Sequence, residues 1–183
     1  MNIVILINNE NQQYLAYKHN KENFVKKKEK QNSKTKSKTR ILIVDDHQVI
    51  REGLTQIINR ETDLWVCAEA GTMEEAVKAV KKQKIDLALV DMLLDSITGI
   101  QVIIKIKTLC PNLITLVFSM SDNLQYVKYA IEVGASGYIT KDEISENIVK
   151  AIRRVLNGQI YISSRLLKNI SKGELDGLLT GKE

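Results

Sequence analysis

The sequence of 183 residues has little of several features that mark special classes of protein. Two cysteines are too few for the disulfide framework of a small secreted protein, and a single proline leaves little to interrupt regular structure. The longest apolar run falls far short of the roughly 20 residues that a membrane span needs. Residues 3–7 are apolar but lack the cationic start and the cleavage site of a signal peptide. These absences favour a cytoplasmic protein without a membrane segment.

The net charge of +5 is unevenly distributed along the chain. The first 40 residues hold ten basic and three acidic residues, whereas the remainder holds 17 basic and 19 acidic ones. Residues 1–39 offer few apolar side chains to offset ordering entropy, so we expect a basic disordered tail. This tail is either a tether to acidic partners or a solvated extension, and the absence of interleaved aromatic residues favours the second. The mildly acidic remainder gives no indication of nucleic-acid binding.

Residues 40–158 alternate between short apolar runs and amphipathic segments. The runs that we predict as strands are 41–44, 65–68, 87–90, 113–118 and 137–140. Apolar residues at helical spacing follow each run, with Thr72 and Glu75 forming a capping box and Gly134 ending a helix. Apolar strands separated by amphipathic helices indicate a parallel sheet covered on both faces. We therefore expect an α/β domain built on a doubly wound, five-stranded parallel sheet.

Polar residues stand at the carboxyl ends of four of these strands. They are Asp45 and Asp46 after the first strand, Asp91 after the third, Ser119 at the end of the fourth and Lys141 after the fifth. Because open α/β sheets bind ligands at this edge, we expect these residues to converge on one site. Each residue alone is an ordinary strand-end or capping residue, but four signals at matching ends are hard to obtain by accident.

The residue types at this edge suit phosphoryl chemistry. Three carboxylates in one crevice repel each other unless a cation joins them, and oxygen ligands favour a hard ion such as Mg²⁺. A carboxylate beside Mg²⁺ can attack phosphorus and form an aspartyl phosphate. A lysine ammonium neutralises the growing phosphoryl charge, and a serine hydroxyl can donate to a phosphoryl oxygen. The set is sufficient for reversible phosphorylation of an aspartate.

Four segments carry a family resemblance. Residues 44–47, 89–92, 117–120 and 134–142 resemble receiver domains of bacterial two-component response regulators, most closely the NarL/LuxR type. The resemblance covers residues 40–158 and implies the flavodoxin-like strand order 2-1-3-4-5. It implies that Asp91 is the phosphoacceptor and that Ser119 and Lys141 contact the phosphoryl group. It also implies that Tyr138 is an aromatic switch, which swings inward when Ser119 moves toward the phosphate.

The resemblance further implies a cofactor and partners. Asp45, Asp46, Asp91 and the main-chain carbonyl of Leu93 would bind Mg²⁺. A sensor histidine kinase would phosphorylate Asp91, and the face formed by the fourth helix, fifth strand and fifth helix would then promote homodimerisation. Such a domain is not an enzyme beyond self-catalysed phosphotransfer and autodephosphorylation. A Mg²⁺-dependent phosphatase with an aspartate nucleophile is the less favoured alternative, because the position of its usual second acid is Leu93.

Two residues beside the predicted site need separate interpretation. The family usually has proline four residues after the phosphoacceptor, and here that position is Asp95. Asp95 either alters phosphate lifetime or metal affinity, or points to solvent, and we favour solvent. His47 is interpreted as a packing or capping residue, because no second histidine lies nearby to complete a zinc site.

The last residues, 159–183, are predicted as a linker with a short helix capped by Ser163 or Ser164. Residues 179–183 resemble the opening of a LuxR-type helix-turn-helix domain, which reads the major groove of DNA. The 183 residues hold no recognition helix, so we expect contact with DNA only through a domain absent from this chain. A stand-alone receiver that acts as a phosphate sink, or as an inactive heterodimer partner, is the alternative.

Overall fold

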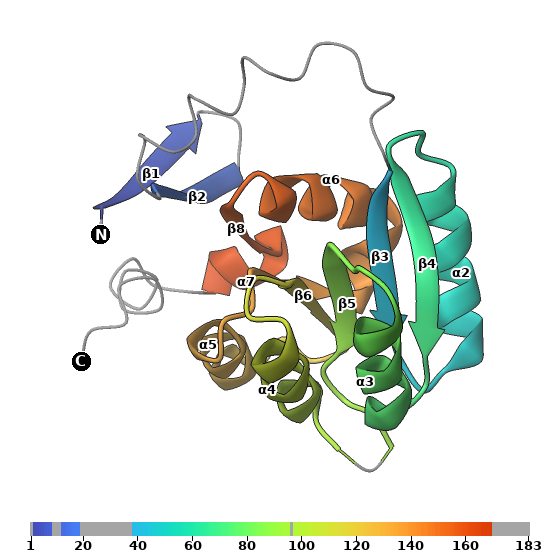
Figure 1. Cartoon of the computed structure of the whole chain (residues 1–183). Coiled ribbons are helices and arrows are strands. Elements are labelled where there is room, and N and C mark those ends of the chain that lie inside the picture. Colours follow the sequence, from blue (N-terminus) through green and yellow to red (C-terminus); the bar gives the residue numbers. More distant parts are fainter. Residues whose placement is uncertain (1, 9–11, 19–37, 96, 170–183) are drawn as a thin grey trace.

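A computed structural model describes residues 2–8, 12–18, 38–95 and 97–169, which form one sheet with helices on both faces (Figure 1). The strands of the domain are β3 (Thr39–Val44), β4 (Leu64–Ala70), β5 (Leu87–Asp91), β6 (Ile114–Ser119), β7 (Gly137–Thr140) and β8 (Gln159–Ile162). The helices are α2 (Gln48–Asn59), α3 (Met73–Lys82), α4 (Gly99–Leu109), α5 (Leu124–Glu132), α6 (Ile144–Leu156) and α7 (Ser164–Asn169), with a 3₁₀ turn η1 (Lys141–Glu143) before α6. Among these helices, none has the length and apolar character needed to cross a bilayer.

The order of the parallel strands is β4-β3-β5-β6-β7-β8. Numbered from β3, this is 2-1-3-4-5-6, so the predicted doubly wound order of the first five strands is confirmed. The sixth strand, β8, was predicted as linker. Tyr161 and Ile162 are both buried there and join the cores on opposite faces of the sheet. A strand of four residues is too short for its alternation to be distinguished from a linker in sequence.

Two further strands occur in the segment for which the sequence predicts a disordered tail. β1 (Asn2–Asn8) and β2 (Gln12–Lys18) pair antiparallel, and β2 continues antiparallel onto β8. The prediction therefore differs from the structure over these two strands, whereas residues 19–37 lie outside the described residues. Pairing gives the backbone groups of β1, β2 and the β8 edge hydrogen-bond partners. The apolar run at residues 3–7 lies within β1, but the basic and polar composition of the first 40 residues favours disorder over a strand.

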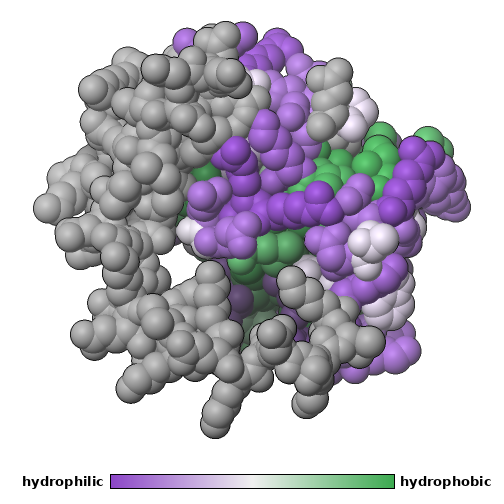
Figure 2. All heavy atoms as spheres, turned by 90° about the horizontal axis from the view of Figure 1, so that it is seen from above, coloured by the Kyte–Doolittle hydropathy of each residue, from purple (hydrophilic) through white to green (hydrophobic). Residues whose placement is uncertain are grey.

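The sheet separates two hydrophobic cores. Along β3, Leu42 and Val44 face one core, and Ile41 and Ile43 face the other. The first core is covered by α3, α4, α5 and α7, and the second by α2 and α6 (Figure 1). Hydrophilic residues cover most of the described surface seen from above, with hydrophobic residues showing between them (Figure 2). Burial on both faces explains why the central strands β3, β5 and β6 are mostly apolar along their length.

Local signals in the sequence set several helix ends. The Thr72 hydroxyl accepts the Glu75 N–H at 3.2 Å, and the Glu75 carboxylate accepts the Gly71 N–H at 2.7 Å. Gly134 follows α5 with a φ of +93°, a conformation that favours glycine. The last large helix, α6, begins at Ile144, after residues 141–143 have formed the η1 turn.

The sixth strand can be tested at Gly137. A Cβ at this position would overlap the main-chain carbonyl oxygen of Tyr161 on β8, so Gly137→Ala should destabilise the fold by about 1–3 kcal/mol. Gly53→Ala on α2 is the control, because a Cβ there meets nothing within 4 Å and should stabilise the helix by about 0.5–1 kcal/mol. Urea unfolding measures both changes. Equal stability of the two variants would contradict the close packing of β8 on β7.

Candidate functional site

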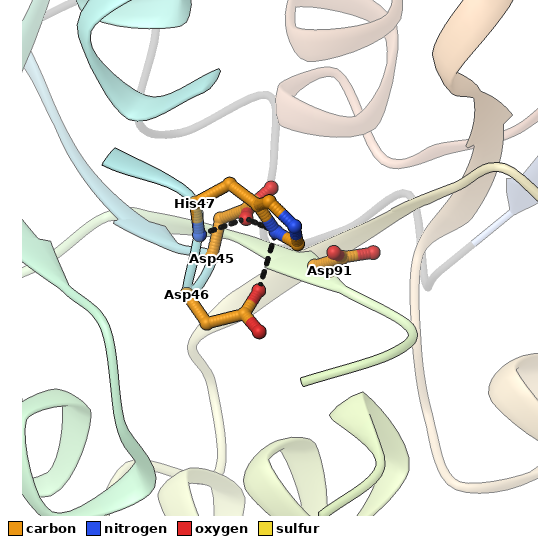
Figure 3. Close-up of side chains that lie close together, drawn as sticks. All are labelled: Asp45, Asp46, His47 and Asp91. Atoms are coloured by element: carbon orange, nitrogen blue, oxygen red, sulfur yellow. Dashed lines mark hydrogen bonds and ion pairs between the residues drawn. The ribbon is translucent and has the colours of Figure 1, made fainter. Parts of the chain in front are cut away.

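The predicted polar residues converge at the carboxyl edge of the sheet. Asp45 follows β3, Asp91 ends β5, Ser119 ends β6 and Lys141 opens η1 after β7. Figure 3 shows the side chains of Asp45, Asp46, His47 and Asp91 gathered in one place. Parallel strands direct their carboxyl ends to the same edge, which brings together residues up to 96 positions apart.

A lysine ammonium joins two buried carboxylates at the centre of the site. The Lys141 Nζ donates to Asp45 Oδ2 at 2.9 Å and to Asp91 Oδ2 at 2.6 Å. Asp45 is fully buried and Asp91 is 3% exposed. The Nζ also lies 5.0 Å from the centre of the Phe118 ring. The two ion pairs offset the cost of removing these carboxylates from water.

Burial and charge shift the pKa values of this pair. Burial raises the pKa of Asp91 above its ordinary value, although the hydrogen bond and charge of Lys141 act in the opposite direction. Burial alone would lower the pKa of Lys141, but its hydrogen bonds with Asp91 and Asp45 outweigh burial and raise it. Lys141 is therefore a firmly held ammonium, and Asp91 is a carboxylate that protonates more readily than usual.

His47 lies against both neighbouring carboxylates. Its Nδ1 is 2.7 Å from Asp46 Oδ1 and 3.2 Å from Asp45 Oδ1, and its main-chain N–H donates to Asp45 Oδ1 at 2.8 Å. The hydrogen bond and charge of Asp46 raise the pKa of His47. His47 is the N-cap residue of α2, as one of the two interpretations predicts, although its imidazole makes no capping hydrogen bond to the helix. The position of His47 directly after Asp45 and Asp46 is the feature of the sequence from which its contact with these carboxylates could have been predicted.

Two residues outside the acidic cluster, Arg51 and Asp95, also donate hydrogen bonds to it. Arg51 Nη1 donates to the main-chain carbonyl of Asp45 at 2.6 Å. The main-chain N–H of Asp95 donates to Asp46 Oδ2 at 3.0 Å, which a proline at that position could not do. Burial tends to raise the pKa of Asp46, but hydrogen bonds involving Asp95 and His47 lower it overall. Asp95 itself is exposed, so its negative charge lies toward solvent.

The donor atoms at this edge fit a hard divalent cation. Asp45, Asp46, Asp91 and His47 can each offer one atom, and these atoms lie within 4.8 Å of one another. Three of the four are carboxylate oxygens, the ligand type that Mg²⁺ prefers. Leu93 lies beside them, and its N–H is 3.4 Å from Asp91 Oδ1. The role of its carbonyl stays a prediction.

Ser119 and Tyr138 meet through one loop residue. Ser119 is fully buried, and its hydroxyl oxygen accepts the Ser121 N–H at 3.0 Å. The Tyr138 hydroxyl donates to the Ser121 carbonyl at 3.0 Å. Tyr138 is fully buried, and burial raises its pKa to about 12. The ring thus already lies inside the domain in this structure, and its movement stays a prediction.

A glycine shapes the backbone next to Asp91. A Cβ at Gly99 would overlap the main-chain carbonyl oxygen of Asp91, so the first residue of α4 must be glycine for the chain to pass this close. The Gly99 N–H donates to the Met92 carbonyl at 2.8 Å. This contact sets the return of the chain from the site into α4.

Comparisons with known proteins identify the family of the chain. The family model for the response regulator receiver domain matches residues 41–153. The transcriptional regulatory protein DegU of Brevibacillus brevis is 32% identical over 136 residues, which cover 74% of this chain and 58% of DegU. The oxygen regulatory protein NreC of Staphylococcus aureus is 33% identical over 132 residues, which cover 72% of this chain and 61% of NreC. The chain thus spans less than two thirds of the length of these relatives.

Solved structures of response regulators are similar to the chain in fold and sequence. A LuxR-family two-component response regulator from Aurantimonas sp. SI85-9A1 has a TM-score of 0.71 and 31% identity, covering 76% of this chain and 99% of that one. The signal receiver domain of the NarL regulator from Mycobacterium tuberculosis has a TM-score of 0.62 and 29% identity, covering 67% and 98%.

The central ion pairs can be tested by removing the ammonium. Lys141→Met leaves two buried carboxylates facing each other, so it should cost about 3 kcal/mol of unfolding free energy at neutral pH. Because the pKa of Asp91 is raised, the loss should shrink as the pH falls and Asp91 becomes neutral. Urea unfolding at neutral and acidic pH measures this. The double variant Lys141→Met/Asp91→Asn should recover most of the stability, and a double variant as unstable as the single one would contradict the interpretation.

The buried phenol can be tested by alkaline titration. The folded pKa of Tyr138 is about 12, whereas an unfolded tyrosine titrates near about 10. The stability that the neutral phenol contributes should be complete below the unfolded value and be lost as the pH rises through the folded one. Tyrosinate absorbance should show a late step that becomes smaller in Tyr138→Phe. Tyr126→Phe, at a partly exposed ring on α5, should leave that step unchanged.

Proposed function

Because the chain belongs to the response regulator receiver family, we propose that Asp91 accepts a phosphoryl group from a sensor histidine kinase. A single observation carries this proposal: one ammonium, that of Lys141, contacts both Asp91 and Asp45 at the carboxyl edge of the sheet. A structural ion pair needs one carboxylate, whereas a phosphoryl acceptor needs a nucleophile, a cation site and a positive charge together. The family resemblance of the NarL/LuxR type supports the same assignment.

The transfer is a displacement at phosphorus. A carboxylate oxygen of Asp91 forms a bond to phosphorus, while the bond from phosphorus to the imidazole nitrogen of the donor histidine breaks. The electron pair of the broken bond stays on that nitrogen, and an aspartyl phosphate results. Lys141 neutralises charge on the transferred group, and the Ser119 hydroxyl donates to one of its oxygens. The domain is otherwise a phosphoacceptor, limited to self-catalysed phosphotransfer and autodephosphorylation.

Mg²⁺ is the cofactor that the donor set fits. Asp45, Asp46, Asp91 and the Leu93 carbonyl would hold it, and the ion would offset the negative charge of the phosphoryl group. Asp46 is well suited to this part because hydrogen bonds keep its pKa low, so it stays ionised. Arg51 fixes the peptide of Asp45 next to it.

The response is proposed to pass through Ser119 and Tyr138. Movement of Ser119 toward the phosphoryl group would break its contact with Ser121, the residue that also holds the Tyr138 hydroxyl. The output face would be α5, β7 and α6, and its change would favour a homodimer. Control of transcription, the role named for the DegU relative, would require a DNA-binding domain beyond the described residues. We propose that the phosphorylation of Asp91 and the response to it take place in the cytoplasm.

Phosphorylation can be measured by intact mass after incubation with acetyl phosphate. The wild type should gain one phosphoryl group only when Mg²⁺ is present, and chelation of the metal should abolish the gain. Asp91→Asn should gain none, because its amide is not a nucleophile. Asp95→Asn is a matched control, since it removes a carboxylate beside the site and keeps the main-chain N–H. Full modification of Asp91→Asn would refute the assignment of the phosphoacceptor.

A further inference from the structure

We propose that α7 relays the state of the acidic site to the residues that follow Asn169, with Arg165 as the positioning residue that connects the two. The proposal rests on the function proposed above. It concerns a segment beyond the matched receiver residues 41–153, and three groups of contacts connect that segment to the loops of the site.

The chain before α7 is firmly anchored on β7. The Ser163 hydroxyl oxygen accepts the Thr140 N–H at 2.8 Å, and the Ser163 N–H donates to the Tyr138 carbonyl at 3.0 Å. Ser163 is fully buried, as is Leu166 on the inner face of α7. Thr140 directly precedes Lys141. The start of α7 is therefore fixed to the strand that carries the site lysine.

The η1 turn caps α7 from outside the helix. Glu143 Oε1 accepts the Ser164 hydroxyl at 3.1 Å and the Arg165 N–H at 3.0 Å. The Arg165 N–H belongs to the first turn of α7, where main-chain donors have no partner within the helix. Glu143 lies two residues after Lys141 on the same short turn. A shift of this turn must move the cap of α7.

One guanidinium spans the two loops that flank the site. Arg165 Nη1 donates to Asp142 Oδ2 at 2.7 Å, and Nη2 lies 3.3 Å from Asp122 Oδ2. Asp142 is the neighbour of Lys141. Asp122 is the neighbour of Ser121, whose main chain contacts both the Ser119 hydroxyl and the Tyr138 hydroxyl. Arg165 therefore contacts both the lysine loop and the serine loop.

The difference in strength between these contacts makes a relay possible. The carboxylate side chains of Asp122 and Asp142 are about half exposed, and exposed ion pairs break at little cost. The anchors at Ser163 and Leu166 are buried and persist. When Ser119 moves toward a phosphoryl group, Asp122 moves with its loop and the contact with Arg165 changes. The first turn of α7 then changes its stability while its base stays in place.

The test is amide hydrogen exchange of residues 164–169 in the whole chain, with and without acetyl phosphate and Mg²⁺. Intact mass measures the phosphoryl content of each sample. In the wild type, exchange of this segment should change about two- to fivefold on phosphorylation, the range that an exposed ion pair supplies. In Arg165→Gln the change should vanish while phosphoryl content stays equal to that of the wild type. Arg165→Lys keeps the positive charge but lacks the two separate guanidinium nitrogens that contact Asp142 and Asp122, so it should keep part of the change.

Two controls separate the relay from simple loss of charge. Lys168→Gln removes the same charge from an exposed position of the same helix and should respond like the wild type. Asp122→Asn should abolish the response as Arg165→Gln does, and the double variant should show no further effect. A phosphorylated wild type with unchanged exchange in residues 164–169 would overturn the relay alone. Absence of any phosphoryl adduct would overturn the proposed function and the relay with it.

Discussion

The structure depends on one constraint: Asp45 and Asp91 are buried beside each other, and only a cation between them makes this tolerable. Parallel β3 and β5 end at the same edge, so the fold itself forces the two carboxylates together. Lys141, which follows β7 and is distant from both aspartates in the sequence, supplies the compensating charge to both. One ammonium does not compensate the negative charge of both carboxylates, so part of that charge remains uncompensated. A metal ion would compensate the remainder, and the same ammonium and ion would then favour the phosphoryl group proposed for Asp91.

Most of the domain could be predicted from the sequence, because burial on both faces of a parallel sheet leaves a simple signature. Strands that are apolar throughout cannot be confused with exposed loops, and each was followed by a helical pattern. The site followed from the same rule, since residues directly after parallel strands must meet at one edge. The convergence of Asp45, Asp91 and Lys141 could thus be predicted from their positions after parallel strands, although the first and the last lie 96 positions apart.

The features that escaped prediction depend on contacts between distant residues. The four residues of β8 carry no period long enough to recognise, and their burial comes from β7 and the helices on both sides. Arg51 looks like any exposed helical arginine until the fold places the Asp45 carbonyl 2.6 Å away. The contact between Asp95 and Asp46 uses a main-chain N–H, which every residue except proline has. The identity of the side chain therefore does not predict this contact.

The η1 turn connects the site to the end of the described chain. Its three residues are consecutive, yet Lys141 faces the buried carboxylates, Asp142 faces Arg165 and Glu143 caps α7. Because the three residues follow one another in a single 3₁₀ turn, a shift of its backbone displaces all three sets of contacts together. Any change in the position of Lys141 therefore reaches α7 directly. The segment after β8 is thus coupled to the charge of the site by the geometry of a single turn, without a separate signalling element.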